Sequence, residues 1–554
     1  MKKINIFCLS LLLLSSVGCK KDFLQEDNKS NVVSDQFFKT AAGYERLVTA
    51  SYASLRTVYS SPFMYCTGTD MYLEAVDALP TSLSEYRTLS PDDPTVTQYY
   101  SDCYKAIQTC NIGLDYNSKT AAASTLTVRK GELEFLRAYY YFLMVQTYGG
   151  VAIVTERTDR PILEFKRNTA DEVYNFIINE MNNAEALVPE TATDYGRVTK
   201  RAIRHYLAKV YLTRAYETFG TSQDFATAAT MADSAINGQT LATSFENLFY
   251  PGNEHDPEIL FSIQYNSASL TSGGFDGGNS QAYYFGPYMG SDPSSGAPSR
   301  YFSLVPSLYV YSNYNQYDAR FNATFMVYVY DRYLDYYDQK ANRQNLNIAW
   351  YFKPSWDAQT DDQWRAADPA HRTNTTIVPF GPLWEPSKNS PVIQFESPAV
   401  KKFDDPTAKY GPATSTRDMF LARLGETYLI AAEAYFNSGN SATAADRINE
   451  VRRRAAFPGQ EANMQITAAD VNINFILDER ARELVGEYHR WFDLKRTGTL
   501  MKRDKIYNRD IKTKWFDQGI NPFLGTNGQY KILRPIPASA ILVNQGQYSQ
   551  NPGY

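Results

Sequence analysis

Apolar residues recur at helical spacing over residues 476–498, near the C-terminal end of the chain. Charged residues fill the other faces of this stretch, and Gly498 is a typical helix end. We therefore predict one amphipathic helix that packs against a helical neighbour. Its spacing also allows the ion pairs Asp478–Arg482 and Glu487–Arg490, each contributing about 0.2–0.5 kcal/mol. The apolar stripe consists of Leu477, Ala481, Leu484, Tyr488, Trp491 and Phe492.

The same periodicity predicts further helices on both sides of the chain's centre. Thr169 and Glu172 form a capping-box pattern at one helix start, and Gly149 favours a left-handed cap at another helix end. Thr467 and Asp470 repeat the capping pattern before the helix at 476. Paired helices of this kind predict a mainly α scaffold of tetratricopeptide-like hairpins. The predicted helices span 44–59, 99–116, 128–148, 170–187, 200–219, 225–237, 419–437 and 442–456.

Helical periodicity stops between residues 249 and 417. Gly, Ser, Asn and Pro are dense there, and short tyrosine-rich runs such as 325–330 favour a few short strands within loops. We predict an N-terminal helical part at 35–248, an irregular aromatic-rich insertion at 249–417 and a C-terminal helical part at 418–554. Residues 35–554 are expected to form one compact unit.

The first 19 residues resemble a bacterial lipoprotein export signal. Lys2 and Lys3 precede a short apolar run, which is too short for a permanent membrane span. We predict a signal peptide at 1–18, lipidation of Cys19 and a polar tether at 19–34. Ser16 departs from the usual pattern, in which leucine is commoner. Several acyl chains on Cys19 would anchor the protein stably to the membrane surface.

Composition excludes some classes of protein. A net charge of -5 gives no electrostatic footprint for nucleic acid. After the leader, Cys66, Cys103 and Cys110 remain, an odd number without CxxC spacing. We predict buried free thiols rather than a disulfide framework or a zinc site. With 43 Tyr and 30 Phe, the chain is rich in aromatic faces that suit sugar and peptide surfaces as well as core packing.

Several motifs in chain order resemble the SusD/RagB family. They are the runs 137–142 (RAYYYF), 146–150 (QTYGG), 420–434 (FLARLGETYLIAAEA) and 448–454 (INEVRRR), with Pro535-Ile-Pro537 and the terminal Asn551-Pro-Gly-Tyr554. Ala152 departs from the family's usual proline. The stretch 476–498 matches the family pattern through Leu477, Glu479, Arg480, Glu483, Leu484, Gly486, Glu487, Arg490, Trp491, Asp493, Leu494 and Arg496.

The resemblance implies a lipid-anchored protein of the cell outer membrane, exposed at the surface. It implies a SusC-like TonB-dependent transporter as partner and an oligosaccharide as ligand, or a peptide as in some relatives. A secreted glycosidase on a helical scaffold is the alternative from another class. Its paired carboxylates would be close only in space, so sequence does not exclude them.

Aromatic faces and planar polar groups are what sugar capture requires. Residues 283–351 hold 14 tyrosines, and the Gly/Pro-containing loop with Tyr283, Tyr284 and Tyr288 is our first candidate site. Trp350 and Trp356 are added because Trp is a strong platform when exposed. We expect most other tyrosines here to pack the insertion's core, and half of the four insertion tryptophans (with Trp364 and Trp384) to be buried.

The loop between the first helices is the second candidate site. The resemblance places ligand contacts there, and its side chains have suitable chemistry. The candidates are Asp70, Tyr72, Asp77, Tyr86 and Arg87.

Sequence motifs argue against catalysis. The four histidines are widely separated, and the chain has no HExxH, GxSxG or Walker motif. The pairs Asp92-Asp93, Asp361-Asp362 and Asp404-Asp405 have ligand chemistry for calcium, but isolated pairs are more typical of solvated loops. We predict no enzyme activity, no metal and no cofactor, and we interpret His489 as a structural histidine.

Overall fold

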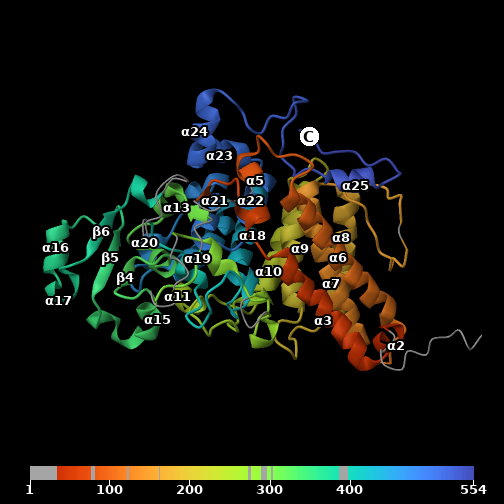
Figure 1. The fold of residues 1–554 in the computed structure, drawn as a ribbon, viewed down its shortest axis with the longest axis horizontal. Helices are drawn as coiled ribbons and strands as arrows, with labels where there is room; N and C mark the ends of the chain where they lie inside the picture. The colour runs from red at the N-terminus through yellow and green to blue at the C-terminus, as the bar shows by residue number, and fades with distance from the viewer. Residues whose placement is uncertain are drawn as a thin grey trace, which may run out of the picture.

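The computed structural model describes residues 34–554 except 76–80, 122–123, 161, 272–275, 288–295, 301–303 and 386–396. Figure 1 shows the N-terminal helices on the right and the small sheet of the insertion on the left. The C-terminal helices α18–α22 lie between them. The chain is mainly helical, as predicted, and its long helices pack as neighbouring hairpins.

The N-terminal part forms three hairpin contacts, between α6 and α7, α7 and α8, and α9 and α10. The predicted long helices of this part are all present, each within about five residues of its expected ends. The helices are α2 (Ser34–Phe38), α3 (Ala41–Val58), α4 (Phe63–Cys66), α5 (Thr81–Glu85), α6 (Pro94–Asn117), α7 (Leu126–Tyr148), α8 (Ala170–Leu187), α9 (Lys200–Ala215), α10 (Ser222–Ile236) and α11 (Phe245–Leu248).

Capping side chains fix where these helices begin. The predicted capping box is confirmed: Thr169 accepts from the Glu172 backbone N–H, and the Glu172 carboxylate accepts from the Thr169 backbone N–H. Asp93 caps α6 by accepting from the Val96 backbone N–H at 3.0 Å. Gly149 ends α7 with φ +70° and ψ -134°, which is not the predicted left-handed cap but still favours a residue without a Cβ.

The insertion consists of short elements. Strand β1 (Tyr72–Glu74) pairs with β3 (Leu304–Pro306), β2 (Ile259–Ile263) pairs with β7 (Met419–Arg423), and β4 (Tyr328–Tyr330), β5 (Ile348–Lys353) and β6 (Thr376–Pro379) form a sheet. β4 and β5 are antiparallel, whereas β5 and β6 are parallel. The helices are α12 (Gln281–Tyr284), α13 (Leu308–Ser312), α14 (Arg320–Thr324), α15 (Asp335–Asp338), α16 (Asp361–Ala366) and α17 (Pro369–Arg372), with 3-10 turns η2 (Ser267–Ser269), η4 (Lys340–Asn345), η5 (Pro382–Trp384) and η6 (Lys401–Phe403).

The C-terminal part begins with a strand, which corrects the predicted helix at 419–437. All five residues of β7 are buried, and a buried strand has no periodicity that distinguishes it from a buried helix. The helices that follow are α18 (Leu424–Asn437), α19 (Ser441–Ala455), α20 (Glu461–Met464), α21 (Ile473–Glu483), α22 (Arg490–Arg496), α23 (Leu500–Tyr507), α24 (Arg509–Lys514) and α25 (Ala538–Leu542), with 3-10 turns η7 (Ala468–Asp470) and η8 (Phe516–Gln518).

The predicted single helix at 476–498 is two helices. The chain breaks between α21 and α22, where Gly486 has φ +76° and Tyr488 has φ +60°. A Cβ on Gly486 would lie 2.3 Å from the Phe403 ring, so the turn requires glycine. Thr467 and Asp470 cap only the turn η7, and Asn472 is the N-cap of α21.

The break turns charged side chains inward. Arg423 donates to Glu483 Oε1 at 2.6 Å and to Glu487 Oε2 at 2.7 Å. The predicted pairs Asp478–Arg482 and Glu487–Arg490 are therefore wrong. Asp478 pairs with Arg503, and Arg482 pairs with Glu479. Glu487 pairs with Arg423, and Arg490 pairs with Asp70. We call the group the charge network. It consists of Arg320, Lys402, Arg423, Arg454, Glu258, Glu479, Glu483 and Glu487, all buried.

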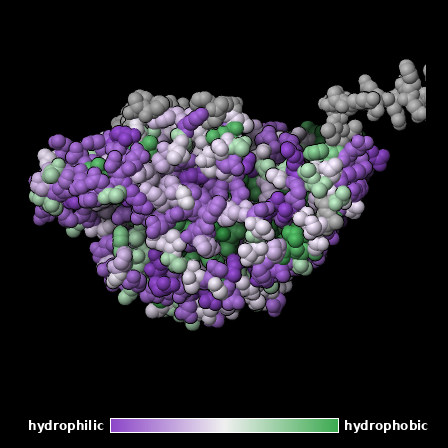
Figure 2. Space-filling model, turned by 90° about the horizontal axis from the view of Figure 1, so that it is seen from below, coloured by the Kyte–Doolittle hydropathy of each residue, from purple (hydrophilic) through white to green (hydrophobic). Residues whose placement is uncertain are grey.

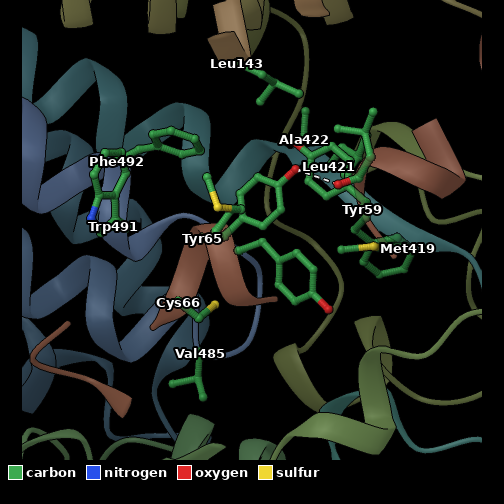
Figure 3. Close-up of a cluster of buried hydrophobic side chains, with 14 of the residues drawn as sticks. Tyr59, Tyr65, Cys66, Leu143, Met419, Leu421, Ala422, Val485, Trp491 and Phe492 are labelled. Atoms are coloured by element: carbon green, nitrogen blue, oxygen red, sulfur yellow. Dashed lines mark hydrogen bonds between the residues drawn. The ribbon is translucent and has the colours of Figure 1, made fainter. Parts of the chain in front are cut away.

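Aromatic packing joins the C-terminal helices to the N-terminal ones. Tyr488 stacks on Tyr65 at 5.3 Å between ring centroids, and Tyr65 stacks on Tyr59 at 4.8 Å. Figure 3 shows Tyr59 and Tyr65 of this cluster, with Leu421 of β7 and Trp491 of α22 around them. Cys66 lies in the same cluster. Cys66, Cys103 and Cys110 are buried free thiols, as predicted.

Candidate functional site

Three residues of the second candidate loop lie inside the protein, which corrects their assignment as ligand contacts. Asp70 accepts from Arg490 Nε at 2.7 Å and Arg503 Nε at 2.6 Å. Burial alone would raise the pKa of Asp70, but the two guanidinium groups outweigh burial and hold the pKa below its ordinary value. This carboxylate joins α22 and α23 to the loop and is not available to a ligand.

Tyr72 and Tyr86 are likewise structural. The Tyr72 hydroxyl accepts from the Gly486 backbone N–H at 2.7 Å. The Tyr86 hydroxyl donates to the Gly68 carbonyl at 2.6 Å, and its ring stacks on Phe523 at 4.0 Å. Both side chains are buried. Their hydroxyls pair with backbone groups inside the protein, as buried polar groups usually do.

Of the remaining candidates in this loop, Arg87 is exposed. Lys531 fixes the backbone around it by donating to the carbonyls of Tyr86 and Leu89, each at 2.9 Å. Asp77 lies outside the described residues, as does Tyr288 of the first candidate loop.

Tyr283 and Tyr284, which we call the tyrosine pair, are half-buried on α12. Their rings are perpendicular, with centroids 5.6 Å apart, and Tyr284 meets the Phe63 ring edge-on at 5.5 Å. Burial raises the pKa of Tyr284, so its hydroxyl stays protonated and can both donate and accept at neutral pH.

The turn that carries the tyrosine pair is anchored. Gln281 Nε2 donates to the Gly486 carbonyl at 2.8 Å, and Ser280 Oγ donates to the Ser60 carbonyl at 2.8 Å. These bonds hold the pair in place before any ligand binds, which reduces the entropy cost of binding.

The two candidate loops meet in space. The ring of Tyr72 lies 5.4 Å from that of Phe285, which directly follows the tyrosine pair. Strands β1 and β3 pair beside them, and the Gly286 backbone N–H donates to the Leu304 carbonyl at 2.9 Å. The tyrosine pair therefore lies at a junction between the first helices and the insertion.

The insertion tryptophans divide as expected. Trp364 and Trp384 are buried, whereas Trp350 and Trp356 are half-buried. Trp356 packs edge-on against Phe321 at 4.8 Å, and Trp350 belongs to β5. Figure 1 places β5 at the far end of the molecule from α6, away from α5 near the centre. Of the ten other tyrosines of 283–351 that the structure describes, seven are buried in the core, as expected: Tyr309, Tyr311, Tyr314, Tyr330, Tyr333, Tyr336 and Tyr351.

Sizeable cavities open on the described surface. One of about 310 Å³ lies between α6 and α25 and is lined mainly by apolar groups such as Ile107, Val154 and Val543. Two others, of about 290 and 230 Å³, share the segment 194–197 and carry more polar groups. The face in Figure 2 is mostly hydrophilic, with hydrophobic residues in small separate groups. The two more polar cavities therefore offer more hydrogen-bonding groups to a hydroxyl-rich ligand than the apolar cavity does.

At least one aspartate of each pair has a structural partner, such as Lys353 for Asp361. Asp93 caps α6, Asp404 accepts from the Tyr333 hydroxyl at 2.6 Å, and Asp405 accepts from Ser415 at 2.8 Å. Within the described residues, no group of three or more His, Cys, Asp or Glu side chains is placed to hold a metal ion. His489 accepts at Nδ1 from Lys209 at 3.1 Å inside the protein, in agreement with a structural histidine.

Comparisons with known proteins agree with this helical scaffold. The SusD family profile matches residues 257–554, and a profile described as "Starch-binding associating with outer membrane" matches residues 22–212. The chain belongs to the SusD family. It is 24% identical to SusD-like protein P2 of Formosa agariphila over 100% of both chains. It is 27% identical to the starch-binding protein SusD of Bacteroides thetaiotaomicron, over 80% of this chain and 76% of that one.

Solved structures share the fold. A laminarin-binding SusD-like protein superposes with a TM-score of 0.65 at 21% identity, covering 93% of this chain and 100% of that one. Surface glycan-binding protein A of Bacteroides thetaiotaomicron, in complex with laminarihexaose, gives a TM-score of 0.65 at 17% identity with the same coverage. Across the part of the chain that the structure describes, we find no helix with the length and apolar character to cross a membrane.

Proposed function

We propose that this chain is a surface lipoprotein that captures oligosaccharides and delivers them to a SusC-like TonB-dependent transporter in the outer membrane. Family membership over most of the chain supports the proposal, and the relatives' names describe starch- and laminarin-binding proteins. The tyrosine pair carries it on the structural side, because it offers two perpendicular ring faces on an anchored turn. Its role is binding and not catalysis.

Replacing both Tyr283 and Tyr284 with alanine is expected to weaken oligosaccharide binding about tenfold. Each aromatic contact contributes on the order of 0.5–1.5 kcal/mol, and about 1.4 kcal/mol corresponds to tenfold in affinity. Isothermal titration calorimetry with maltoheptaose, laminarihexaose and a xyloglucan oligosaccharide measures the loss, on the mature chain in detergent.

The control for this test is Tyr530→Ala, since Tyr530 is 47% exposed and outside both candidate loops. Its affinity should equal that of the wild type. Loss of melting temperature with unchanged affinity in the double variant would assign the tyrosine pair to the core. Hydrolysis of the added sugar would instead support a glycosidase, and binding of peptides but no sugar would support the peptide-binding alternative.

We also propose that Cys19 carries the lipid anchor. Cys19→Ala is expected to abolish incorporation of radiolabelled palmitate and to release the protein from the membrane fraction, because the anchor's acyl chains supply about 0.8 kcal/mol per buried CH₂. Cys66→Ala is the control, since Cys66 is a buried thiol in the folded part. Unchanged labelling of the Cys19 variant would contradict lipidation at this position.

A further inference from the structure

A polar cleft lies on the N-terminal helices, separate from the tyrosine pair. It comprises the two adjoining cavities of about 290 and 230 Å³. Its walls are α3 around Arg56, the connection between α8 and α9 at 194–197, and the end of β2 at 262–264. We call it the α3 cleft. Its two cavities approach the size typical of small-molecule sites, about 300–1,000 Å³.

A fixed aromatic ring stands at the edge of the α3 cleft. Tyr195 is 37% exposed, yet it stacks on His255 with ring centroids 3.7 Å apart. Its hydroxyl donates to the Glu254 carbonyl. The stacking on His255 and the hydrogen bond of the hydroxyl thus hold the ring in place while part of its surface faces solvent. A ring held in this way loses little entropy when a sugar stacks on it.

Unused polar groups face the same cleft. Ser262 is 3% exposed, and its Oγ makes no full hydrogen bond within the described residues, although it lies close enough to the Tyr195 hydroxyl to lower that group's pKa against the effect of burial. A ligand hydroxyl would give this buried group a full hydrogen bond. Within the described chain, the Gln264 side-chain amide also lacks a protein partner. Gly196 lets this amide pack closely, because a Cβ there would lie 2.0 Å from Gln264 Nε2.

The α3 cleft is lined by charges of both signs, among them Arg56, Arg197 and Asp194, so they strongly select neither an anion nor a cation. Arg197 donates to Glu132 at 2.9 Å and to Glu45 at 3.4 Å, so its charge is balanced. Arg56 donates through Nε and Nη2 to the Gln264 carbonyl and lies 5.0 Å from the Tyr265 ring. Its third nitrogen, Nη1, has no partner within the described residues and remains a planar donor for a hydroxyl.

A ring face, a carboxamide, a guanidinium donor and a buried hydroxyl without a full hydrogen bond together match the chemistry of a neutral, polyhydroxylated ligand. We infer that the α3 cleft is a second oligosaccharide-binding subsite, independent of the tyrosine pair. The inference rests on the proposed glycan-binding function. The subsite lies close to the first, because Ser60 near the end of α3 accepts from Ser280 at the base of α12. One protein can therefore hold a glycan at two places.

Hydrogen–deuterium exchange with saturating laminarihexaose, maltoheptaose or xyloglucan oligosaccharide tests the inference on the full mature chain. We expect protection of peptides covering 49–56, 194–197 and 259–264 in addition to 280–287. In a Tyr195→Ala/Gln264→Ala variant, protection of the first three should disappear and that of 280–287 should remain. Tyr195→Phe keeps the ring face and should retain protection in all four.

The outcomes separate the two proposals. Protection confined to 280–287 would overturn the second subsite and leave glycan binding intact. Protection of the cleft peptides that persists in the Tyr195→Ala/Gln264→Ala variant would also overturn it. If none of the three sugars protects any peptide, the proposed glycan-binding function fails, and the second subsite with it.

Discussion

Replacing Glu483 with alanine is expected to lower the free energy of unfolding by about 3–5 kcal/mol, the usual cost of leaving buried charges unpaired. Its Oε1 accepts from Arg423 at 2.6 Å and Arg454 at 2.5 Å, and its Oε2 accepts from Arg320 at 2.8 Å. All four side chains are buried. Removing this one carboxylate leaves three guanidinium groups with too few acceptors, and water does not reach them to compensate.

Urea unfolding followed by circular dichroism measures the effect, and Glu450→Ala is the matched control. Glu450 pairs with Arg453 at 2.5 Å on the same C-terminal scaffold, but both side chains are more than 40% exposed. An exposed pair contributes about 0–1 kcal/mol, so the control should unfold close to the wild type. Equal losses in the two variants would show that the charge network does not stabilise this fold.

The long helices could be predicted because their signals are local. The capping box at Thr169 and the glycine at 149 mark a helix start and a helix end within a few residues of sequence. The domain boundaries at 249 and 418 and the compactness of residues 35–554 stay predictions.

The break at 484–489 could not be predicted, because its cause is tertiary. An amphipathic pattern continues through it, yet Gly486 packs against Phe403 and Glu487 reaches Lys402 and Arg423. Ion pairing across the fold outweighs the small gain from neighbouring pairs on one helix. Strand β7 was missed for a related reason, since burial on both faces removes the periodicity that reveals a strand.

Candidate site residues were harder to choose because chemistry suitable for a ligand is also suitable for the core. Asp70 and Tyr86 have polar groups in a loop, but those groups bind Arg490 and the Gly68 carbonyl. The α3 cleft was missed because its residues come from three distant segments. The doublet Tyr195-Gly196 in a helix connection was the one local sign.

Stability is expected to fall as pH drops below about 6.5, the ordinary pKa of histidine. Burial lowers the pKa of His489 to about 3, with Lys209 adding to the effect against the attraction of Glu426. Between these values the unfolded chain binds a proton that the folded chain does not. The stability from His489 is therefore complete above pH 6.5 and is lost as pH falls toward 3.

Buried carboxylates extend this loss to lower pH. Burial would raise the pKa of Asp493, but Arg480 and Arg496 outweigh burial and lower it to about 2. Its contribution is complete above its unfolded pKa near 4 and declines toward 2. The free energy of unfolding, from urea titrations between pH 7.5 and 3, should therefore stay level down to about pH 6.5 and fall below it. His489→Gln should flatten the slope below pH 6.5 by about 1.4 kcal/mol per pH unit, the value for one proton. A slope in the variant equal to that of the wild type would mean that His489 is protonated in the folded protein, in conflict with its hydrogen bond from Lys209.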